Sequence, residues 1–329
     1  MTRLAIDVMG GDLGVAPLVL GAIQALKELP DLNLILVGSK DEIVASIDVH
    51  CYGSRVSIVD VPDVVDMDDN PLAALRNKPD ASMPAALDLL AEGKVDAVVS
   101  AGNTGALVAF GVQKIGMQDH FSRPAICTQM PAATGTTWLL DLGATLSANQ
   151  DRFLELAKLG AEQCRAYNGV HRPRVGLLNV GVEEGKGTEE LALAATQMVN
   201  ETDYEYCGYV EGGSIFSEQV DVVVCDGFSG NVAIKTAQGM LRLIVEKISQ
   251  WRESGWFSRI LLWVFSPALK RIARELNPAT YNGAPLLGLK GLVVKSHGHA
   301  GEQDFSNAVL LAVKIIERKG KMAADSRSA

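Results

Sequence analysis

Four times along the chain of 329 residues, a short apolar run ends in a glycine-containing turn that leads into a helical pattern. Repeated succession of strand, turn and helix is typical of an α/β fold with a largely parallel sheet. The carboxyl ends of such strands gather at a ligand-binding edge, so the turns are predicted to form a polar crevice. The four strand-and-turn pairs are residues 4–9 with 10–14, 96–100 with 101–105, 174–180 with 179–189, and 221–225 with 226–231.

The third turn has the residues of an anion-binding loop. Gly185 and Gly187 flank Lys186, so the backbone can bend close to an anion while one mobile ammonium group reaches over it. An ATP-binding P-loop would need a glycine at Val180 and a hydroxyl at Gly187, and without that hydroxyl the Mg²⁺ ligand is missing. The loop therefore predicts an anion site but no ATPase, with a solvated loop and a surface lysine as the alternative.

The other turns end in polar side chains of less specific meaning. Asn103 and Thr104 are expected at a helix N-terminus, which favours an anion, although an ordinary helix cap explains them as well. Asp7 and Asp12 are open to both readings too, as turn and cap residues or as ligand contacts. None of the turns has the Gly-x-Gly-x-x-Gly spacing of a dinucleotide-binding strand and helix.

The composition narrows the class of protein. With 30 basic and 39 acidic residues the net charge is −9, which argues against general nucleic-acid binding. Five scattered cysteines without a Cys-x-x-Cys pair indicate reduced thiols in a cytoplasm. An acid at position 7 interrupts the first apolar run, so no signal peptide is predicted, and an apolar run long enough to span a bilayer is lacking.

Two histidines close to the C-terminus are candidate metal ligands. His297 and His299 lie two residues apart, but the sequence places neither a cysteine nor a carboxylate cluster beside them, so no metal is predicted. His297 is expected to contact an anion or to carry a proton, and a hydrogen-bonded structural histidine is the alternative.

Residues 242–276, which we call the basic amphipathic segment, differ from the rest of this acidic chain. Seven lysines and arginines and three of the four tryptophans fall there, beside aliphatic residues at helical spacing. This pattern favours a helix at an anionic membrane surface, with packing against a partner subunit as the alternative. The predicted membrane contacts are Trp256, Phe257, Ile260, Leu261, Trp263, Val264 and Phe265.

Six short motifs occur in order along the chain: residues 7–12, 100–105, 185–189, 226–231 and 283–288, and the pair His297-Gly298. Their order resembles the PlsX family, the acyl-acyl carrier protein:phosphate acyltransferases of bacterial phospholipid synthesis. The resemblance implies a fold like those of isopropylmalate dehydrogenase and phosphotransacetylase, with two lobes around a cleft in residues 1–319 and a protruding amphipathic segment. It also implies a homodimer without a metal or other cofactor. The polar composition of residues 320–329 separately predicts a disordered tail.

The implied reaction transfers a long-chain acyl group from the thioester of acyl carrier protein to inorganic phosphate, which gives acyl phosphate. Because phosphate is itself the nucleophile, a catalytic serine or cysteine is not required. Lys186 is expected to hold phosphate, Asn231 and Asn103 to position or polarise the acyl carbonyl, and His297 to support phosphate or the proton balance. The phosphate- and substrate-binding residues are expected to be Gly10, Gly11, Asp12, Asn103, Thr104, Gly185, Gly187, Asp226, Ser229 and Gly230.

Three rival functions are also compatible with the sequence. A dehydrogenase of the same fold would reduce NAD, and a phosphotransacetylase would use coenzyme A esters instead of acyl carrier protein. A non-catalytic scaffold at the membrane would leave the four polar turns unexplained.

The implied product is consumed by a glycerol-phosphate acyltransferase in the membrane, so a cytoplasmic protein attached to the membrane surface is expected.

We predict that liposomes of anionic lipid carry the wild type upward in a flotation gradient. A Leu261→Glu, Trp263→Glu variant should stay at the bottom, because two carboxylates would enter the apolar face. Equal flotation of both proteins would contradict membrane contact through this segment.

Overall fold

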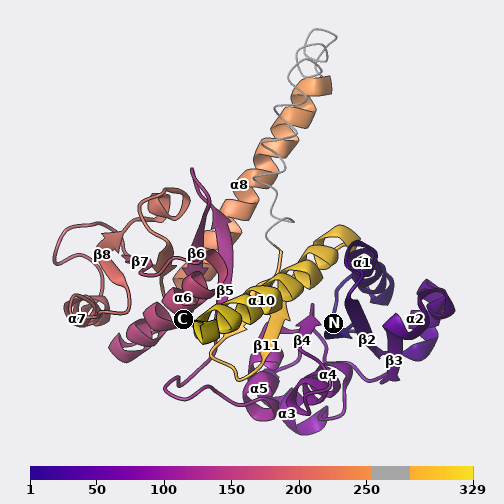
Figure 1. The fold of residues 1–329 in the computed structure, drawn as a ribbon. Helices are drawn as coiled ribbons and strands as arrows, with labels where there is room; N and C mark the ends of the chain where they lie inside the picture. Colours follow the sequence, from indigo (N-terminus) through magenta and orange to yellow (C-terminus); the bar gives the residue numbers. More distant parts are fainter. Residues whose placement is uncertain (254–281, 329) are drawn as a thin grey trace.

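A computed structural model describes residues 1–253 and 282–328, and its core is one mixed sheet (Figure 1). In the described residues the strand order is β3-β2-β1-β4-β11-β10-β5-β6-β9-β7-β8. The strands are β1 Thr2–Asp7, β2 Leu32–Gly38, β3 Val56–Asp60, β4 Ala97–Ser100, β5 Ala125–Pro131, β6 Thr136–Leu140, β7 Arg174–Leu178, β8 Glu205–Val210, β9 Val222–Val224, β10 Ala284–Leu287 and β11 Leu292–Lys295.

Three antiparallel pairings in the middle of the sheet separate two parallel blocks, which run in opposite directions. One block holds β1 to β4 and β11, and the other holds β6 to β9. The two blocks are offset along the strand direction. Val224 at the end of β9 pairs with Leu140 of β6, and Leu140 pairs with Cys127 of β5. The neighbouring Ile126 pairs with Leu286 of β10. The carboxyl ends of both blocks therefore approach the middle of the sheet.

Helices cover both faces of the sheet. α1, α6 and α10 pack on one face, and α10 lies across β11 beside α1 (Figure 1). α4 and α5 cover the other face of the first block, while α8 and η2 pack on that same face of the second block. The helices are α1 Val15–Glu28, α2 Lys40–Ser46, α3 Pro71–Asn77, α4 Ser82–Ala91, α5 Thr104–Lys114, α6 Gln150–Asn168, α7 Glu189–Met198, α8 Gly227–Glu253 and α10 Glu302–Ser328, with 3-10 helices η1 Val49–Arg55 and η2 Gly212–Phe216.

Local sequence explains where many of these elements begin and end. The Asn149 side chain accepts a hydrogen bond from the Arg152 amide at 3.0 Å and so starts α6, and Gly169 ends this helix in the left-handed region with φ 72°. Thr188 caps α7 in the same way through the Leu191 amide. These caps satisfy backbone groups that a helix end would otherwise leave without partners.

α8 begins where the chain after β6 comes very close to it. A Cβ atom on Gly230 would overlap the carbonyl oxygen of Asp141 and would lie 2.8 Å from the Cys225 sulfur. A Cβ atom on Gly227 would likewise overlap the Thr145 carbonyl oxygen. Glycine at these positions therefore lets the first turn of α8 rest on the backbone of residues 141–145. From there α8 extends away from the sheet (Figure 1).

The observed fold agrees with the predicted α/β class. The apolar runs at residues 124–130 and 137–144 also predict two adjacent strands, and these form the hairpin of β5 and β6. Two details differ from the prediction. β10 was not predicted from the sequence, and α10 continues to Ser328, through residues for which a disordered tail was expected. The first part of the basic amphipathic segment, up to Glu253, belongs to α8, and the rest lies outside the described residues.

The close contact at Gly230 leads to a stability prediction. Gly230→Ala should lower the free energy of unfolding by about 1–3 kcal/mol, because the added methyl group has to displace backbone. Gly239→Ala on the same helix is the matched control, since a Cβ atom there meets nothing within 4 Å. The control should keep or raise the stability by about 0.5–1 kcal/mol through helix propensity. Urea denaturation followed by circular dichroism measures both, and equal effects would contradict the contact.

Candidate active site

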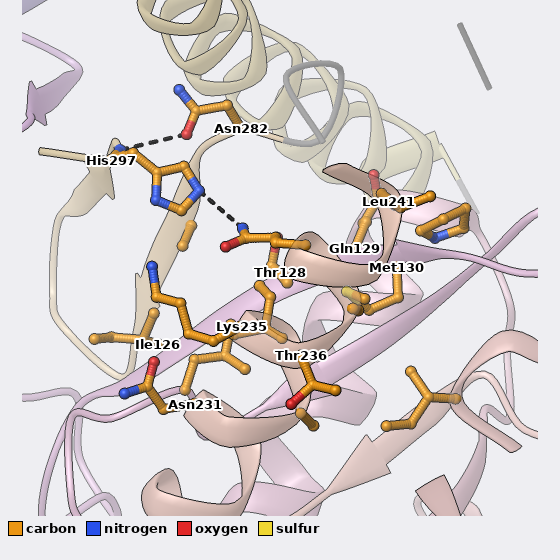
Figure 2. A pocket seen from close by; sticks show the side chains of 18 of the residues that line it. Ile126, Thr128, Gln129, Met130, Asn231, Lys235, Thr236, Leu241, Asn282 and His297 are labelled. Atoms are coloured by element: carbon orange, nitrogen blue, oxygen red, sulfur yellow. Dashed lines mark hydrogen bonds between the residues drawn. The ribbon is translucent and has the colours of Figure 1, made fainter. Parts of the chain in front are cut away.

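A cavity of about 670 Å³ lies between α8 and the ends of the central strands (Figure 2). Its walls come from β5, η2, α8, the start of β10 and the end of β11, and its volume suits an organic ligand of moderate size. Most of the wall is apolar, and the ionisable side chains in its described lining are Lys235, Lys295 and His297. The apolar lining includes Ile126, Met130, Pro131, Leu142, Ile215, Phe216, Ala233, Ile234, Ala237, Met240 and Leu241.

α8 supplies two polar side chains to this cavity. Asn231 and Lys235 are four residues apart, so they lie on the same side of the helix and both line the cavity. Figure 2 shows Asn231 and Lys235 on the side of His297, with Met130 and Leu241 on the opposite side. The charged side of the cavity, which we call its polar end, therefore lies beside His297, and the opposite side, its apolar end, is mainly apolar, with Gln129 as a polar side chain there.

The polar end also contains a buried lysine at the end of β11. Lys295 is 8% exposed, and its ammonium group donates hydrogen bonds to the carbonyl oxygens of Ala101, at 3.1 Å, and Ser296. The side chain lines the cavity as well. Lys295 and Lys235 thus place two ammonium groups at one end of an otherwise apolar space.

His297 lies beside these two lysines. Its Nε2 atom is 3.1 Å from the side-chain nitrogen of Gln238 on α8, and its backbone amide donates to the Asn282 side-chain oxygen at 3.3 Å (Figure 2). With the Gln238 amide as donor, Nε2 is the acceptor and the proton of a neutral ring is on Nδ1. Asn282 is fixed in turn by donating to the Ser296 hydroxyl and to the Asp304 carbonyl oxygen.

Burial and mutual repulsion change the protonation of these groups. Burial lowers the pKa of Lys295 to about 8; Asp12 opposes this shift and the Lys235 charge adds to it. Burial also lowers the pKa of His297 to about 4, and the charges of Lys235 and Lys295 act in the same direction. At neutral pH the imidazole is therefore neutral and the Lys295 ammonium is still charged. This end of the cavity is suited to an anion.

Three of the side chains predicted from the sequence line the cavity, namely Thr104, Asn231 and His297. Asn103, just before Thr104, has a structural role instead. Its side-chain oxygen caps α5 through the Ala106 amide, and its amide group donates to the carbonyl oxygens of Met67 and Asp69 at 2.9 and 3.0 Å. Both ends of the side chain are in use, so the alternative of a helix cap is favoured over a contact with the acyl carbonyl.

The turn after β1 packs against its neighbours. A Cβ atom on Gly10 would lie 2.5 Å from the Gly102 Cα atom, and one on Gly11 would lie 2.9 Å from a Leu18 methyl group. The Asp12 amide donates to the Gly298 carbonyl oxygen at 2.8 Å, and its carboxylate pairs with His299 at 2.7 Å. These residues therefore support the loop that carries His297, and they are not part of the cavity lining.

The loop of Lys186 lies outside the lining of this cavity. Its side chain is exposed, and the backbone is held by a hydrogen bond from the Asn179 side chain to the Lys186 carbonyl oxygen at 3.0 Å. Gly185 and Gly187 have φ angles of 85° and 87°, which explains the two glycines by turn geometry. The loop follows β7, the strand next to β9, so it is one strand farther from the cavity than the start of α8.

The predicted residues before Asn231 act on the position of α8. The Asp226 carboxylate accepts from the Ser229 amide at 2.8 Å and from its hydroxyl at 2.9 Å, which caps the helix. Gly230 provides the close contact with residue 141 described above. The three residues thus direct Asn231 and Lys235 toward the cavity without lining it.

Sequence reasoning missed Lys235, Lys295, Gln238 and Asn282. A signal existed for the two lysines: Lys235 is one helical turn after Asn231, and Lys295 ends the strand that leads directly to His297. The seven predicted membrane contacts, from Trp256 to Phe265, lie outside the described residues. Among residues 1–253 and 282–328, no group of three or more His, Cys, Asp or Glu side chains is arranged to hold a metal ion.

Comparison with known proteins adds to this geometry. The chain matches the family described as fatty acid synthesis protein over residues 2–322. The chain belongs to this family. The match identifies the same family, PlsX, as the resemblance in the sequence, and it covers nearly the whole chain.

Relatives with assigned names agree with this family. A phosphate acyltransferase of Cellvibrio japonicus (strain Ueda107) is 42% identical over 96% of this chain and 95% of its own length. A phosphate acyltransferase of Legionella pneumophila (strain Paris) is also 42% identical, over 95% of this chain and 92% of its own.

Solved structures show the fold. A branched-chain phosphotransacylase from Enterococcus faecalis V583 has a TM-score of 0.61 at 15% identity, covering 96% of this chain and 99% of its own. A phosphotransacetylase from Streptococcus pyogenes has a TM-score of 0.59 at 15% identity, covering 96% and 94%. A 4-hydroxythreonine-4-phosphate dehydrogenase from Klebsiella pneumoniae has a TM-score of 0.58 at 15% identity, covering 96% and 99%. The predicted fold, shared by phosphotransacetylases and dehydrogenases, is confirmed.

The neutral state of His297 can be tested directly. In ¹⁵N-detected imidazole spectra, His297 should gain its second proton near pH 4, well below the usual value of about 6.5. Lys235→Met should raise the pKa of His297, because one of the repelling charges is removed. A midpoint near 6.5 in the wild type, unchanged in the variant, would contradict the electrostatics of this site.

Proposed function

We propose that this protein transfers a long-chain acyl group from acyl carrier protein to inorganic phosphate and releases acyl phosphate. One observation carries the proposal: a single cavity joins an apolar end to an end with two ammonium groups. An acyl thioester and phosphate require these two environments side by side. The family and the names of its relatives support the same chemistry.

The polar end is the proposed phosphate site. Phosphate carries one to two negative charges at neutral pH, and Lys235 and Lys295 offer charge-assisted hydrogen bonds to it. The exposed Lys235 side chain can adapt, whereas Lys295 is fixed by two backbone carbonyl groups. His297 is neutral at this pH, and its Nδ1–H group is a further hydrogen-bond donor for phosphate.

The apolar end is the proposed acyl site. Met130, Ile215, Phe216 and Leu241 line it and offer hydrophobic contact to an acyl chain. Each methylene group buried there contributes about 0.8 kcal/mol, so binding should strengthen with chain length until the space is filled. The carbonyl carbon then lies next to the phosphate site, near Asn231.

The reaction follows from this arrangement. An oxygen of hydrogen phosphate attacks the thioester carbon, a C–O bond forms, and the carbonyl oxygen gains negative charge. Asn231 is suited to stabilise that charge as a hydrogen-bond donor. The C–S bond then breaks, and the sulfur takes up the proton that phosphate brought. The products are acyl phosphate and the free thiol. Because Lys295 is buried, its positive charge favours binding of the phosphate anion before the attack.

Lys186 remains a proposed second phosphate ligand. The strand before its loop, β7, pairs in parallel with β9, the strand before α8, so the loop leaves the same edge of the sheet as the start of α8. The glycines on both sides of Lys186 make the loop suitable for a change of backbone conformation.

We further propose a cytoplasmic homodimer attached to the membrane surface, where a glycerol-phosphate acyltransferase takes the product. Exposed apolar side chains along α8 support a partner surface: Met240, Leu243, Ile244, Val245, Ile248 and Trp251. In the described residues, no helix is long and apolar enough to cross a bilayer. Sedimentation equilibrium with and without liposomes would separate a second copy from lipid as the partner of α8.

An acyl-phosphate assay with palmitoyl-acyl carrier protein and phosphate tests the proposal. Lys235→Met and Lys295→Met should each raise KM for phosphate about 10- to 150-fold, since a hydrogen bond to a charged group contributes about 1.5–3 kcal/mol. Lys94→Met, at an exposed surface pair with Glu92, is the matched control and should leave KM unchanged. Lys186→Ala in the same assay decides whether its loop contributes.

The donor distinguishes the proposal from its rivals. Acyl carrier protein should be used far better than the coenzyme A ester of the same acyl chain, and the reverse would indicate a phosphotransacetylase. Phosphate-independent reduction of NAD would indicate a dehydrogenase. Wild-type protein that forms no acyl phosphate from either donor would contradict the proposed reaction altogether.

A further inference from the structure

Asp7 is a buried carboxylate that the proposed reaction does not use directly. It is the last residue of β1 and is 0% exposed. Its oxygens accept hydrogen bonds from the Ser100 hydroxyl at 2.6 Å, the Ser82 hydroxyl at 2.8 Å and the Met9 amide at 3.3 Å. Burial raises the pKa of Asp7, and the hydrogen bonds from Ser100, Ser82 and Met9 together with the Lys295 charge oppose that shift. A carboxylate without these donors would be costly to bury, so the surroundings are arranged to hold it.

The sheet register connects Asp7 with the phosphate end of the cavity. Asp7 pairs with Ser100 across β1 and β4, and Ser100 pairs with Lys295 across β4 and β11. Residues that pair in this way on parallel strands point to the same face of the sheet. Asp7, Ser100 and Lys295 therefore form one row on the face that α4 and α5 cover.

The turn after β4 links the two ends of this row. The Ser100 hydroxyl, which donates to Asp7, accepts from the Gly102 amide at 3.1 Å. Ala101 lies between Ser100 and Gly102 in the chain, and its carbonyl oxygen accepts a hydrogen bond from the Lys295 ammonium group at 3.1 Å. The turn is closely packed, because a Cβ atom on Gly102 would lie 2.5 Å from a Met83 methyl group and 3.2 Å from the Ser100 hydroxyl.

We infer that Asp7 is a positioning residue for Lys295: it fixes the turn at residues 100–102, and the Ala101 carbonyl in that turn aims the ammonium group at bound phosphate. This inference rests on the proposed phosphate site. Asp7 acts through Ser100 and the turn, and also through its negative charge, which favours the charged form of Lys295.

The charged groups that face Lys295 determine the effect of removing Asp7. Asp7 and Asp12 stabilise the ammonium form, Lys235 opposes it, and His297 is neutral at working pH. The pKa of Lys295 is already lowered to about 8 by burial, so loss of the Asp7 charge should lower it further. The pH above which phosphate no longer binds should then decrease.

Titration calorimetry with inorganic phosphate between pH 6.5 and 9 tests the inference. Asp7→Asn keeps the size of the side chain and one acceptor but removes the charge. It should weaken phosphate binding by about tenfold at pH 7.5 and shift the alkaline loss of binding to lower pH, by about one unit. In a Lys295→Met background, Asp7→Asn should have little further effect, because both substitutions act on one interaction.

Ser82→Ala is the control for a merely structural role. It removes the hydroxyl that binds Asp7 from α4 and leaves the Ser100 hydrogen bond in place. It should lower the melting temperature but keep the phosphate affinity and its pH dependence. If Asp7→Asn and Ser82→Ala changed phosphate binding alike, or if Asp7→Asn and Lys295→Met were additive, the inference would be wrong.

The same measurements separate this inference from the proposed reaction. If the wild type binds phosphate and responds to Asp7→Asn as expected but forms no acyl phosphate, the reaction is contradicted and the inference stands. If the wild type forms acyl phosphate while Asp7→Asn leaves its phosphate affinity unchanged, only the inference is contradicted. A wild type that binds no phosphate between pH 6.5 and 9 contradicts both.

Discussion

Lys295 holds its ammonium group at the end of β11, beside a mainly apolar cavity, and burial there opposes its charge. The surrounding structure compensates for this opposition through two backbone carbonyl groups and the negative charges of Asp7 and Asp12. A bound anion can supply the remaining stabilisation of the buried Lys295 charge. A buried cation that is stabilised only in part is well suited to attract phosphate, because binding completes its solvation.

The glycine-containing turns around the site serve two different purposes. The turns at Gly10 and Gly102 touch through their backbones, which brings β1 and β4 close enough for Asp7 to reach Ser100. At Gly230 the close contact instead sets the first turn of α8, which places Asn231 and Lys235 over the cavity. In both cases the glycines allow backbone to approach backbone, and the chemistry is left to side chains a few residues away.

Much of the fold could be predicted from the sequence because apolar periodicity and turn residues act locally. The strand before Asn103, the hairpin formed by β5 and β6, and the helix after residue 188 all follow from such patterns. β10 could not be identified in this way, since four residues with a proline become a strand only when β5 and β11 pair with them. The extension of α10 into residues 320–328 was missed because a polar pattern does not mark a helix end.

The candidate site was predictable only in part, and the reason is geometric. Sequence alone determined the α/β class, the family, and the polar side chains Asn231, Thr104 and His297 that line the cavity. Lys186 was predicted as the phosphate ligand because glycines on both sides of a lysine are a pattern that the sequence shows directly. Only the tertiary structure selected Lys235 and Lys295, since burial, the stagger of the two parallel blocks and the path of α8 decide which charges meet, and these depend on contacts far apart in the chain.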